Sequence, residues 1–240
     1  GDHRDLHYPL RRQRQMCIRD SGGYSSEYDI SIKSGEFIFE ILNNNPEWNV
    51  YRILISKGNA SVLLSDDKII KINQDDFSFE YDKNKIEFDA IYNITHGSPG
   101  ETGKFSSLLE RIGIPQTSCS SKICKLTFDK HEYVKFINSL NLKTAKQFFI
   151  KKGEEYNVDD IIEKTGIPCF VKPNKSGSSF GISKVTNKHY LNEKINFAFQ
   201  EDDEVLVESF LDGKEVSVGV INIDGKRTIL PITEIISKNE

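Results

Sequence analysis

The stretch Pro168–Val185 constrains the fold most, because it places a strand, a loop and a second strand in quick succession. Phe170 and Val171 are strand-forming residues, and Pro173 ends the hydrogen-bonding ladder because it has no backbone N–H. The loop that follows is rich in glycine, serine and lysine. Its backbone N–H groups, hydroxyls and ammonium groups can cradle a polyphosphate. An ordinary hairpin with a solvated basic tip also fits this composition, so the stretch alone leaves both interpretations open.

This loop matches neither of two common phosphate-binding motifs. No Lys-Ser or Lys-Thr pair follows its second glycine, and no helix is expected to open there. The spacing G-x-G-x-x-G is absent as well. The sequence therefore excludes a P-loop and a dinucleotide fingerprint at this position.

Length and charge narrow the class of protein. A chain of 240 residues is long enough for one large domain or two ordinary ones. Its net charge of -4 argues against a protein that coats nucleic acid. No apolar run approaches the length of a membrane span, and the N-terminus lacks the apolar core of a secretory signal. The four cysteines lack a metal-ligating pattern, so we expect reduced thiols and a cytoplasmic location.

Residues 1–21 differ from the rest of the chain in composition. They contain five arginines, whereas the remaining chain contains three and uses lysine instead. They show neither an amphipathic repeat nor the alternation of a strand. We therefore expect a non-native or disordered segment, arising from a misassigned start, a sequencing artefact or a disordered tail. A basic targeting peptide is a weaker interpretation, because Asp2, Asp5 and Asp20 interrupt the positive charge.

From residue 22 onward the pattern alternates between strands and helices, which favours α/β layers with a parallel sheet. Such sheets bind ligands at the carboxyl ends of their strands, and two turns, Gly22–Glu27 and His96–Gly103, are candidates for that edge. His96 alone also fits a structural histidine. The expected elements of this half are a helix at 30–42, a strand at 50–55, a hairpin at 61–64 and 68–72, a strand at 88–94 and a helix at 105–112.

The second half continues the alternation around the Pro168–Val185 stretch. Asp224-Gly225 is a turn signal and is expected to close the last hairpin. The expected elements are a helix at 127–140, a strand at 145–150, helices at 159–165 and 190–199, a strand at 204–210 and a hairpin of 215–220 with 228–232.

Five motifs in this order and spacing resemble those of D-alanine–D-alanine ligases. The match covers residues 22–240 and leaves residues 1–21 outside it. The motifs are Gly22–Ser31, His96–Gly103 with the Asp129-Lys130 pair downstream, Phe170–Val185, Val205–Val218 and Pro231–Glu234.

The resemblance implies an α/β (α+β) protein of three parts. A Rossmann-like pre-ATP-grasp domain that binds substrate would span residues 22–118. The central subdomain of an ATP-grasp fold would span 119–211, and residues 212–240 would begin a C-terminal subdomain that is incomplete in this chain.

The resemblance also implies a reaction. The family joins two D-alanines with ATP and Mg²⁺ (or Mn²⁺), through a D-alanyl phosphate, to supply peptidoglycan synthesis in the cytoplasm. The products are the dipeptide, ADP and phosphate. The expected partners are therefore ATP and two molecules of D-alanine, without nucleic acid or membrane, in a homodimer.

Residue by residue, the resemblance assigns roles to side chains around the first substrate and the triphosphate. Glu27 would hold the ammonium group of the first D-alanine, and His96 would lie beside its carboxylate and the acylphosphate. Ser178 and Ser179 would lie in the loop over the triphosphate, with Ser178 also hydrogen-bonding across the site towards Glu27.

The expected ATP-binding residues follow in the same way. Lys130 and Lys172 would bind the phosphates, where positive charge offsets the charge of a transferring phosphoryl group. Glu208 and Leu211 would flank the segment that receives adenine. Glu215 would accept hydrogen bonds from both ribose hydroxyls.

The chain departs from the family pattern in two ways. Ser106 stands where a glutamine is usual, and Gln116–Cys119 replaces a Tyr-Thr-Gly-Ser turn. The metal-binding carboxylates, a catalytic arginine and the lid loop of the family would lie beyond residue 240, so no metal ligand is assigned here. We expect that the chain as written cannot complete catalysis. Two alternatives remain: a ligase that uses D-lactate or D-serine as second substrate, and a non-catalytic ATP-binding module.

Overall fold

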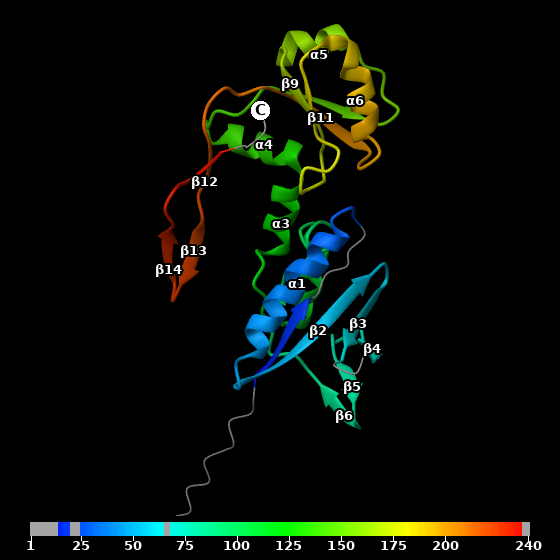
Figure 1. Ribbon diagram of the computed structural model, residues 1–240, viewed down its shortest axis with the longest axis vertical. Coiled ribbons are helices and arrows are strands. Elements are labelled where there is room, and N and C mark those ends of the chain that lie inside the picture. The colour runs from blue at the N-terminus through cyan, green and yellow to red at the C-terminus, as the bar shows by residue number, and fades with distance from the viewer. Residues whose placement is uncertain (1–13, 20–24, 65–67, 237–240) are drawn as a thin grey trace, which may run out of the picture.

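The computed structural model describes residues 14–19, 25–64 and 68–236. Figure 1 shows two units of sheet and helix, followed by a ribbon of short strands. This arrangement confirms the expected α/β (α+β) class. Among the described residues, no helix is both long and apolar enough to cross a membrane.

The first unit is built on a five-stranded sheet in the order β4-β3-β2-β1-β7. As expected, β1, β2 and β7 are parallel, whereas β3 and β4 extend the sheet as antiparallel strands. A separate hairpin of β5 and β6, which the sequence pattern did not reveal, packs beside it. The bounds are β1 (Arg14–Arg19), β2 (Trp48–Ser56), β3 (Asn59–Leu63), β4 (Ile69–Lys71), β5 (Phe79–Tyr81), β6 (Asn84–Ile86) and β7 (Ala90–Asn93).

Strand β1 corrects the expectation that residues 1–21 lie outside the fold. The backbone of Arg14–Arg19 pairs with β2 on one side and with β7 on the other, at an inner position of the sheet. This pairing is a long-range contact of the backbone, which the local composition of residues 1–21 does not reveal. Residues 1–13 and 20–21 lie outside the described residues.

Two helices complete the first unit. Helix α1 (Tyr28–Asn43) packs against β1 and β2, and α2 (Lys104–Ile112) contributes Phe105 and Leu109 to the hydrophobic core. Ile53 of β2 is fully buried in the same core. The start of α1 and the His96–Gly103 turn lie close together, because the His96 N–H donates to the Ser31 hydroxyl at 2.9 Å. Of the predicted Gly22–Glu27 turn, residues 22–24 lie outside the described residues.

A helix expected at 127–140 is in fact two helices. Asp129 has an extended backbone and separates α3 (Ser121–Phe128) from α4 (Lys130–Ser139). Its side chain accepts a hydrogen bond from the Glu132 N–H, which caps the first turn of α4. The expected helix covers only the last two residues of α3, and it runs through the break because the apolar spacing continues past Asp129.

The second unit is a four-stranded antiparallel sheet in the order β10-β9-β11-β8. The strand–loop–strand predicted for Pro168–Val185 is confirmed as the antiparallel pair β9 and β10. The bounds are β8 (Gln147–Lys151), β9 (Cys169–Pro173), β10 (Ser183–Val185) and β11 (Glu204–Ser209).

Two helices pack on this second sheet. Helix α5 (Val158–Thr165) contacts β8 and β11, and α6 (Leu191–Ala198) contacts β9 and β10. A short 3-10 helix, η1 (Lys188–Tyr190), leads into α6. Val171 and Val207 are fully buried between the sheet and these helices.

After β11 the chain leaves the second unit and forms a narrow ribbon that stands apart from both units (Figure 1). The inner hairpin turns at Asp224-Gly225 as expected, but its strands are shorter and shifted, because the outer strands pair with each other instead. The bounds are β12 (Glu215–Ser217), β13 (Val220–Ile223), β14 (Lys226–Ile229) and β15 (Thr233–Ile235).

We predict that Ile53→Ala lowers the free energy of unfolding by about 2–5 kcal/mol, because it removes buried methylene groups and leaves a cavity. Ile69→Ala is the matched control in the same sheet, since its side chain is 61% exposed; its cost should stay within about 0.5 kcal/mol. Urea denaturation measures both. Equal losses would contradict the assigned core.

Candidate functional site

The carboxylate of Glu27 lies at the junction of the two units. It is 2% exposed, at the N-cap of α1, and its Oε1 accepts a hydrogen bond of 2.6 Å from the Ser178 hydroxyl. The two residues are 151 positions apart in the sequence. The other oxygen, Oε2, is buried without a hydrogen-bond partner. A buried carboxylate oxygen that lacks a partner is costly, so this atom is poised to receive a cation or a donor.

Two glycines let the chain approach this carboxylate closely. A Cβ at Gly97, which has a φ of +65°, would lie 2.6 Å from Glu27 Oε2 and 2.3 Å from the Ser25 hydroxyl. A Cβ at Gly177 would lie 2.6 Å from Glu27 Oε1. The His96–Gly103 turn and the Pro168–Val185 loop therefore close on Glu27 from two sides, and only glycine fits at these two positions.

His96 is held beside this carboxylate by α1. Its backbone N–H donates to the Ser31 hydroxyl at 2.9 Å, and its Nε2 lies 3.3 Å from the Ser34 hydroxyl. Glu101 is fixed by accepting from the Gly97 N–H at 2.7 Å. One ligand atom from each of Glu27, His96 and Glu101 lies within 4.8 Å of the others. This group suits a bound cation, either an ammonium or a metal ion.

Glu101 is a site residue to which the sequence reasoning gave no role. It stood within the quoted His96–Gly103 motif, so the signal was present. Its contribution depends on the turn, because Gly97 N–H and the Glu101 carboxylate meet only when the chain folds back over four residues.

Two lysines create a positive region on the other side of the Pro168–Val185 loop. Lys130 begins α4, and its ammonium donates to the carbonyl of Asn174 at 3.1 Å and to the carbonyl of Ser176. Burial lowers the pKa of Lys130, and the positive charge of Lys172 lowers it further. The two positive charges repel each other, and an anion bound between them would relieve that repulsion. The two ammonium groups therefore provide a binding site for an anion.

Lys172 is placed by the sheet. It lies on β9 and forms an ion pair with Glu208 of the neighbouring β11. Glu208 also accepts a hydrogen bond of 2.5 Å from the Gln147 amide on β8. The structure therefore brings Lys130, Lys172 and Glu208 together. Their roles towards the phosphates and adenine stay predictions.

The loop between β9 and β10 has an unusual backbone. Ser178 and Ser179 have φ values of +47° and +62°, and Gly181 has +72°. A Cβ at Gly181 would lie 2.7 Å from the Pro173 ring, so the loop turns back tightly on its own first strand. This turn directs Ser178 towards Glu27.

The last two predicted site residues are not gathered into this cluster. The Leu211 side chain is 67% exposed, and Glu215 is exposed at the start of β12. Their roles towards adenine and ribose stay predictions.

A cavity of about 370 Å³ lies between the two units, and it is lined by Glu27, Thr102, Lys175 and Ser176 among others.

Comparison with known proteins decides the family. The family model of the D-Ala–D-Ala ligase N-terminus matches residues 21–119, and that of the C-terminus matches residues 136–240. The chain is 46% identical over 219 residues to a D-alanine–D-alanine ligase of Flavobacterium johnsoniae, covering 91% of this chain and 68% of that protein. The chain belongs to the D-alanine–D-alanine ligase family.

Solved structures of this family have the same fold. The D-alanyl-alanine synthetase A of Vibrio cholerae superposes with a TM-score of 0.83 at 27% identity, covering 94% of this chain and 69% of that one. The VanG D-Ala:D-Ser ligase of Enterococcus faecalis gives 0.77 at 27% identity, with 92% and 69% covered. The D-alanine–D-alanine ligase of Bacillus anthracis complexed with ATP gives 0.69 at 26% identity, with 95% and 67% covered. The expected ATP-grasp architecture is thereby confirmed.

The family implies ATP and a divalent metal, and the described residues fit these two differently. Lys130, Lys172 and the loop donors suit a polyphosphate. Among the residues that the structure describes, the only cluster of three possible metal ligands is Glu27, His96 and Glu101, and Mg²⁺ prefers oxygen ligands alone. That cluster therefore does not fit a magnesium site, and ligands beyond residue 240 stay a prediction.

We predict that Gly97→Ala destabilises the fold more than Gly58→Ala. Both positions have a left-handed φ, which costs about 1–2 kcal/mol for alanine. Only at Gly97 would the new Cβ also meet Ser25 and Glu27, whereas nothing lies within 4 Å at Gly58. Chemical denaturation of the two variants measures the difference, and equal losses would contradict the close packing around Glu27.

Proposed function

We propose that this chain carries the first-substrate site and the nucleotide phosphate site of an ATP-dependent ligase that joins two D-alanines. The observation that carries the proposal is the hydrogen bond from Ser178 to Glu27. It joins the phosphate loop to a buried carboxylate of the other unit, so that a phosphate and an amino acid bound at these places would be neighbours. The dipeptide would supply peptidoglycan synthesis.

Glu27 would bind the ammonium group of the first D-alanine through Oε2, the oxygen without a partner. An ion pair at a buried site is much stronger than on the surface, because little water screens it. His96, held by Ser31 and Ser34, would lie beside the carboxylate of the same molecule. One end of the substrate would thus be fixed while its carboxylate faces the phosphates.

In the first step, a carboxylate oxygen of D-alanine would attack the γ-phosphorus of ATP, and the bond from phosphorus to the β–γ bridging oxygen would break. Lys130 and Lys172 would stabilise the negative charge on the transferring group and on the departing ADP. Bound ATP would favour the ammonium form of Lys130, whose pKa burial and Lys172 depress. ATP as the nucleotide is supported by the similar Bacillus anthracis structure.

In the second step, the amine of a second D-alanine would attack the carbonyl carbon of the D-alanyl phosphate, and inorganic phosphate would leave. An acylphosphate is sensitive to water, so the loop that carries Ser178 and Ser179 would need to cover it. The backbone of this loop already turns back against Glu27. The divalent metal would neutralise phosphate charge, with ligands that we expect beyond residue 240. We also propose that the protein forms a homodimer and acts in the cytoplasm.

A ligase that takes D-serine as second substrate is the alternative, supported by the similarity to the VanG enzyme. The name of the 46% identical relative favours D-alanine instead. A non-catalytic ATP-binding module, the other alternative from the sequence, predicts nucleotide binding without D-alanine-dependent turnover. Measuring ATP binding and phosphate release together therefore distinguishes it from a ligase.

We predict that the full gene product releases phosphate from ATP only when D-alanine is present. Glu27→Gln should raise the KM for D-alanine about 10- to 100-fold, which corresponds to roughly 1.4–2.8 kcal/mol, because the amide keeps an acceptor but loses the charge. Affinity for ATP, measured by calorimetry, should change little. Phosphate release that does not depend on D-alanine, or an unchanged KM, would argue against the proposal.

Lys172→Ala should weaken ATP binding about 10-fold or more, because charge-assisted contacts to phosphate contribute about 1.5–3 kcal/mol each. Lys152→Ala is the matched control, since Lys152 forms an exposed ion pair with Asp203 at 3.0 Å. Calorimetry with ATP on both variants makes the comparison. If both lose affinity equally, a specific phosphate role for Lys172 fails.

A further inference from the structure

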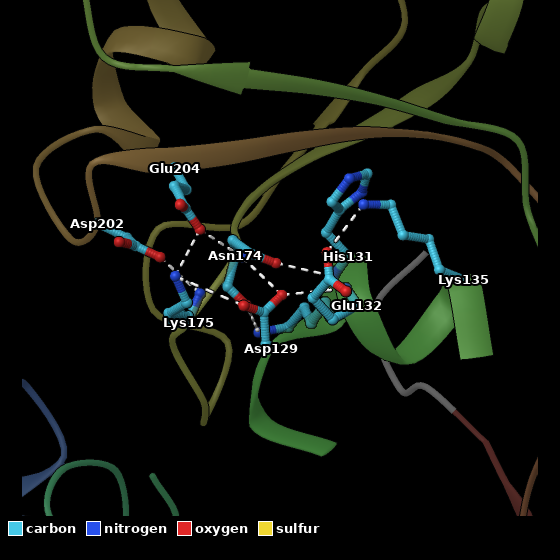
Figure 2. A network of polar contacts seen from close by, with 9 residues as sticks. Asp129, His131, Glu132, Lys135, Asn174, Lys175, Asp202 and Glu204 are labelled. Atoms are coloured by element: carbon cyan, nitrogen blue, oxygen red, sulfur yellow. Dashed lines mark hydrogen bonds and ion pairs between the residues drawn. The ribbon is translucent and has the colours of Figure 1, made fainter. Parts of the chain in front are cut away.

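Asn174 is a buried polar residue at the point where β9 meets the phosphate loop. Its side chain is fully buried, and nothing in the sequence reasoning gave it a role beyond loop chemistry. Buried amides are retained where their hydrogen bonds are satisfied. Figure 2 shows Asn174 at the centre of a network of acidic and basic side chains from several elements.

The Asn174 side chain holds the start of α4. Its Oδ1 accepts from the His131 N–H at 2.9 Å, and its Nδ2 donates to Asp129 Oδ1 at 3.0 Å. The same Nδ2 donates to Glu204 Oε2 at 2.8 Å, and the Asn174 N–H donates to the Glu204 carbonyl at 2.8 Å. One residue thus ties the loop to the first turn of α4 and to the start of β11.

Lys130 lies between the two residues that Asn174 holds. Asp129 precedes it and His131 follows it, and both are hydrogen-bonded to the Asn174 side chain. The Lys130 ammonium itself donates to the carbonyls of Asn174 and Ser176. An ammonium has three N–H donors, so one remains to point at a phosphate oxygen.

The surrounding charges make an amide the suitable side chain at this position. The Lys175 ammonium pairs with Glu204 at 2.6 Å and with Asp129 at 3.5 Å (Figure 2). The backbone N–H of Lys175 donates to the Asp202 carboxylate at 2.6 Å. Burial acts to raise the pKa of Asp129, but hydrogen bonds, including the one from Asn174, hold it below the usual value. Asn174 therefore supplies donors to two carboxylates without adding a further negative charge.

We propose that Asn174 is a positioning residue for nucleotide binding, which fixes the Lys130 ammonium at the mouth of the phosphate loop. The proposal rests on the proposed function, since it takes a nucleotide polyphosphate as the ligand. Asn174 would not contact the nucleotide itself, because its side chain is fully buried and would act through Lys130.

A double-mutant cycle tests this, with ATP as the probe and calorimetry on the full gene product. Asn174→Ala should weaken ATP binding about 10-fold, and Lys130→Ala at least as much. The double variant should bind ATP within twofold of Lys130→Ala, because Asn174 has nothing left to position. A purely structural role would instead weaken binding in both backgrounds by the same factor.

Asn157→Ala is the matched control. Asn157 also holds a helix N-terminus, because its side chain accepts from the Asp159 N–H of α5 at 2.8 Å, and it lies in the same unit. It should leave ATP affinity within twofold of its own background, whether that background is the unmodified protein or Lys130→Ala. A loss equal to that of Asn174→Ala would overturn the proposal.

Two further results would overturn it: ATP affinity unchanged in Asn174→Ala, or losses from Asn174→Ala and Lys130→Ala that multiply in the double variant. If Asn174→Ala does not fold, Asn174→Ser keeps a short polar group, and the same cycle should show about a threefold loss that disappears without Lys130. An unmodified protein that does not bind ATP would refute the proposed function itself, which distinguishes the two failures.

Discussion

The hydrogen bond between Ser178 and Glu27 joins two units that are otherwise built separately. A hydrogen bond to a charged group contributes about 1.5–3 kcal/mol, and more is lost when one partner is left buried alone. The geometry around it is restrictive, since Gly97 and Gly177 both lie where a Cβ would collide with the Glu27 carboxylate. The bond therefore fixes which oxygen of Glu27 is occupied and leaves the other, Oε2, buried without a hydrogen-bond partner.

The charges on the two sides of this bond are of opposite sign. Glu27, His96 and Glu101 gather on the side of the first unit, whereas Lys130 and Lys172 gather beside the second sheet. An amino acid carries a positive and a negative end, and a nucleotide carries several negative charges. A zwitterion with its ammonium on the acidic side would present its carboxylate to the phosphates, which is the orientation that acyl phosphate formation needs.

Local sequence signals predicted much of the fold. Helix α1, strand β2 and the β9–β10 hairpin follow from periodicity, strand propensity and the proline at position 173, and the structure confirms them. The division of one expected helix at Asp129 was missed, because the apolar spacing continues while the break depends on a side chain that caps the next helix. The strand order of the second sheet was not predicted, since the pairing of β11 with β8 and β9 depends on contacts far apart in sequence.

The site was predictable to the extent that motifs carried it. The hydrogen bond of Ser178 to Glu27 was expected from the resemblance and is found in the structure, whereas the ion pair of Lys172 with Glu208 beside Lys130 was not predicted. The role of Asn174 was not predicted, because its hydrogen-bond partners are far from it in the sequence. They come from the break before α4 and from the first residue of β11, and the pattern of residue types along the chain does not show that these segments come together.

The left-handed backbone of Ser178 and Ser179 connects these observations. Side chains in that region of φ cost of the order of 1–2 kcal/mol each, so the surrounding structure must hold them there. The hydrogen bond to Glu27 holds Ser178 at one end of the loop, and the Lys130 ammonium holds the Ser176 carbonyl at the other. Both anchors are groups that a bound substrate would also contact. A nucleotide and an amino acid would therefore act on the loop through its own anchors, which couples their binding to the loop's conformation.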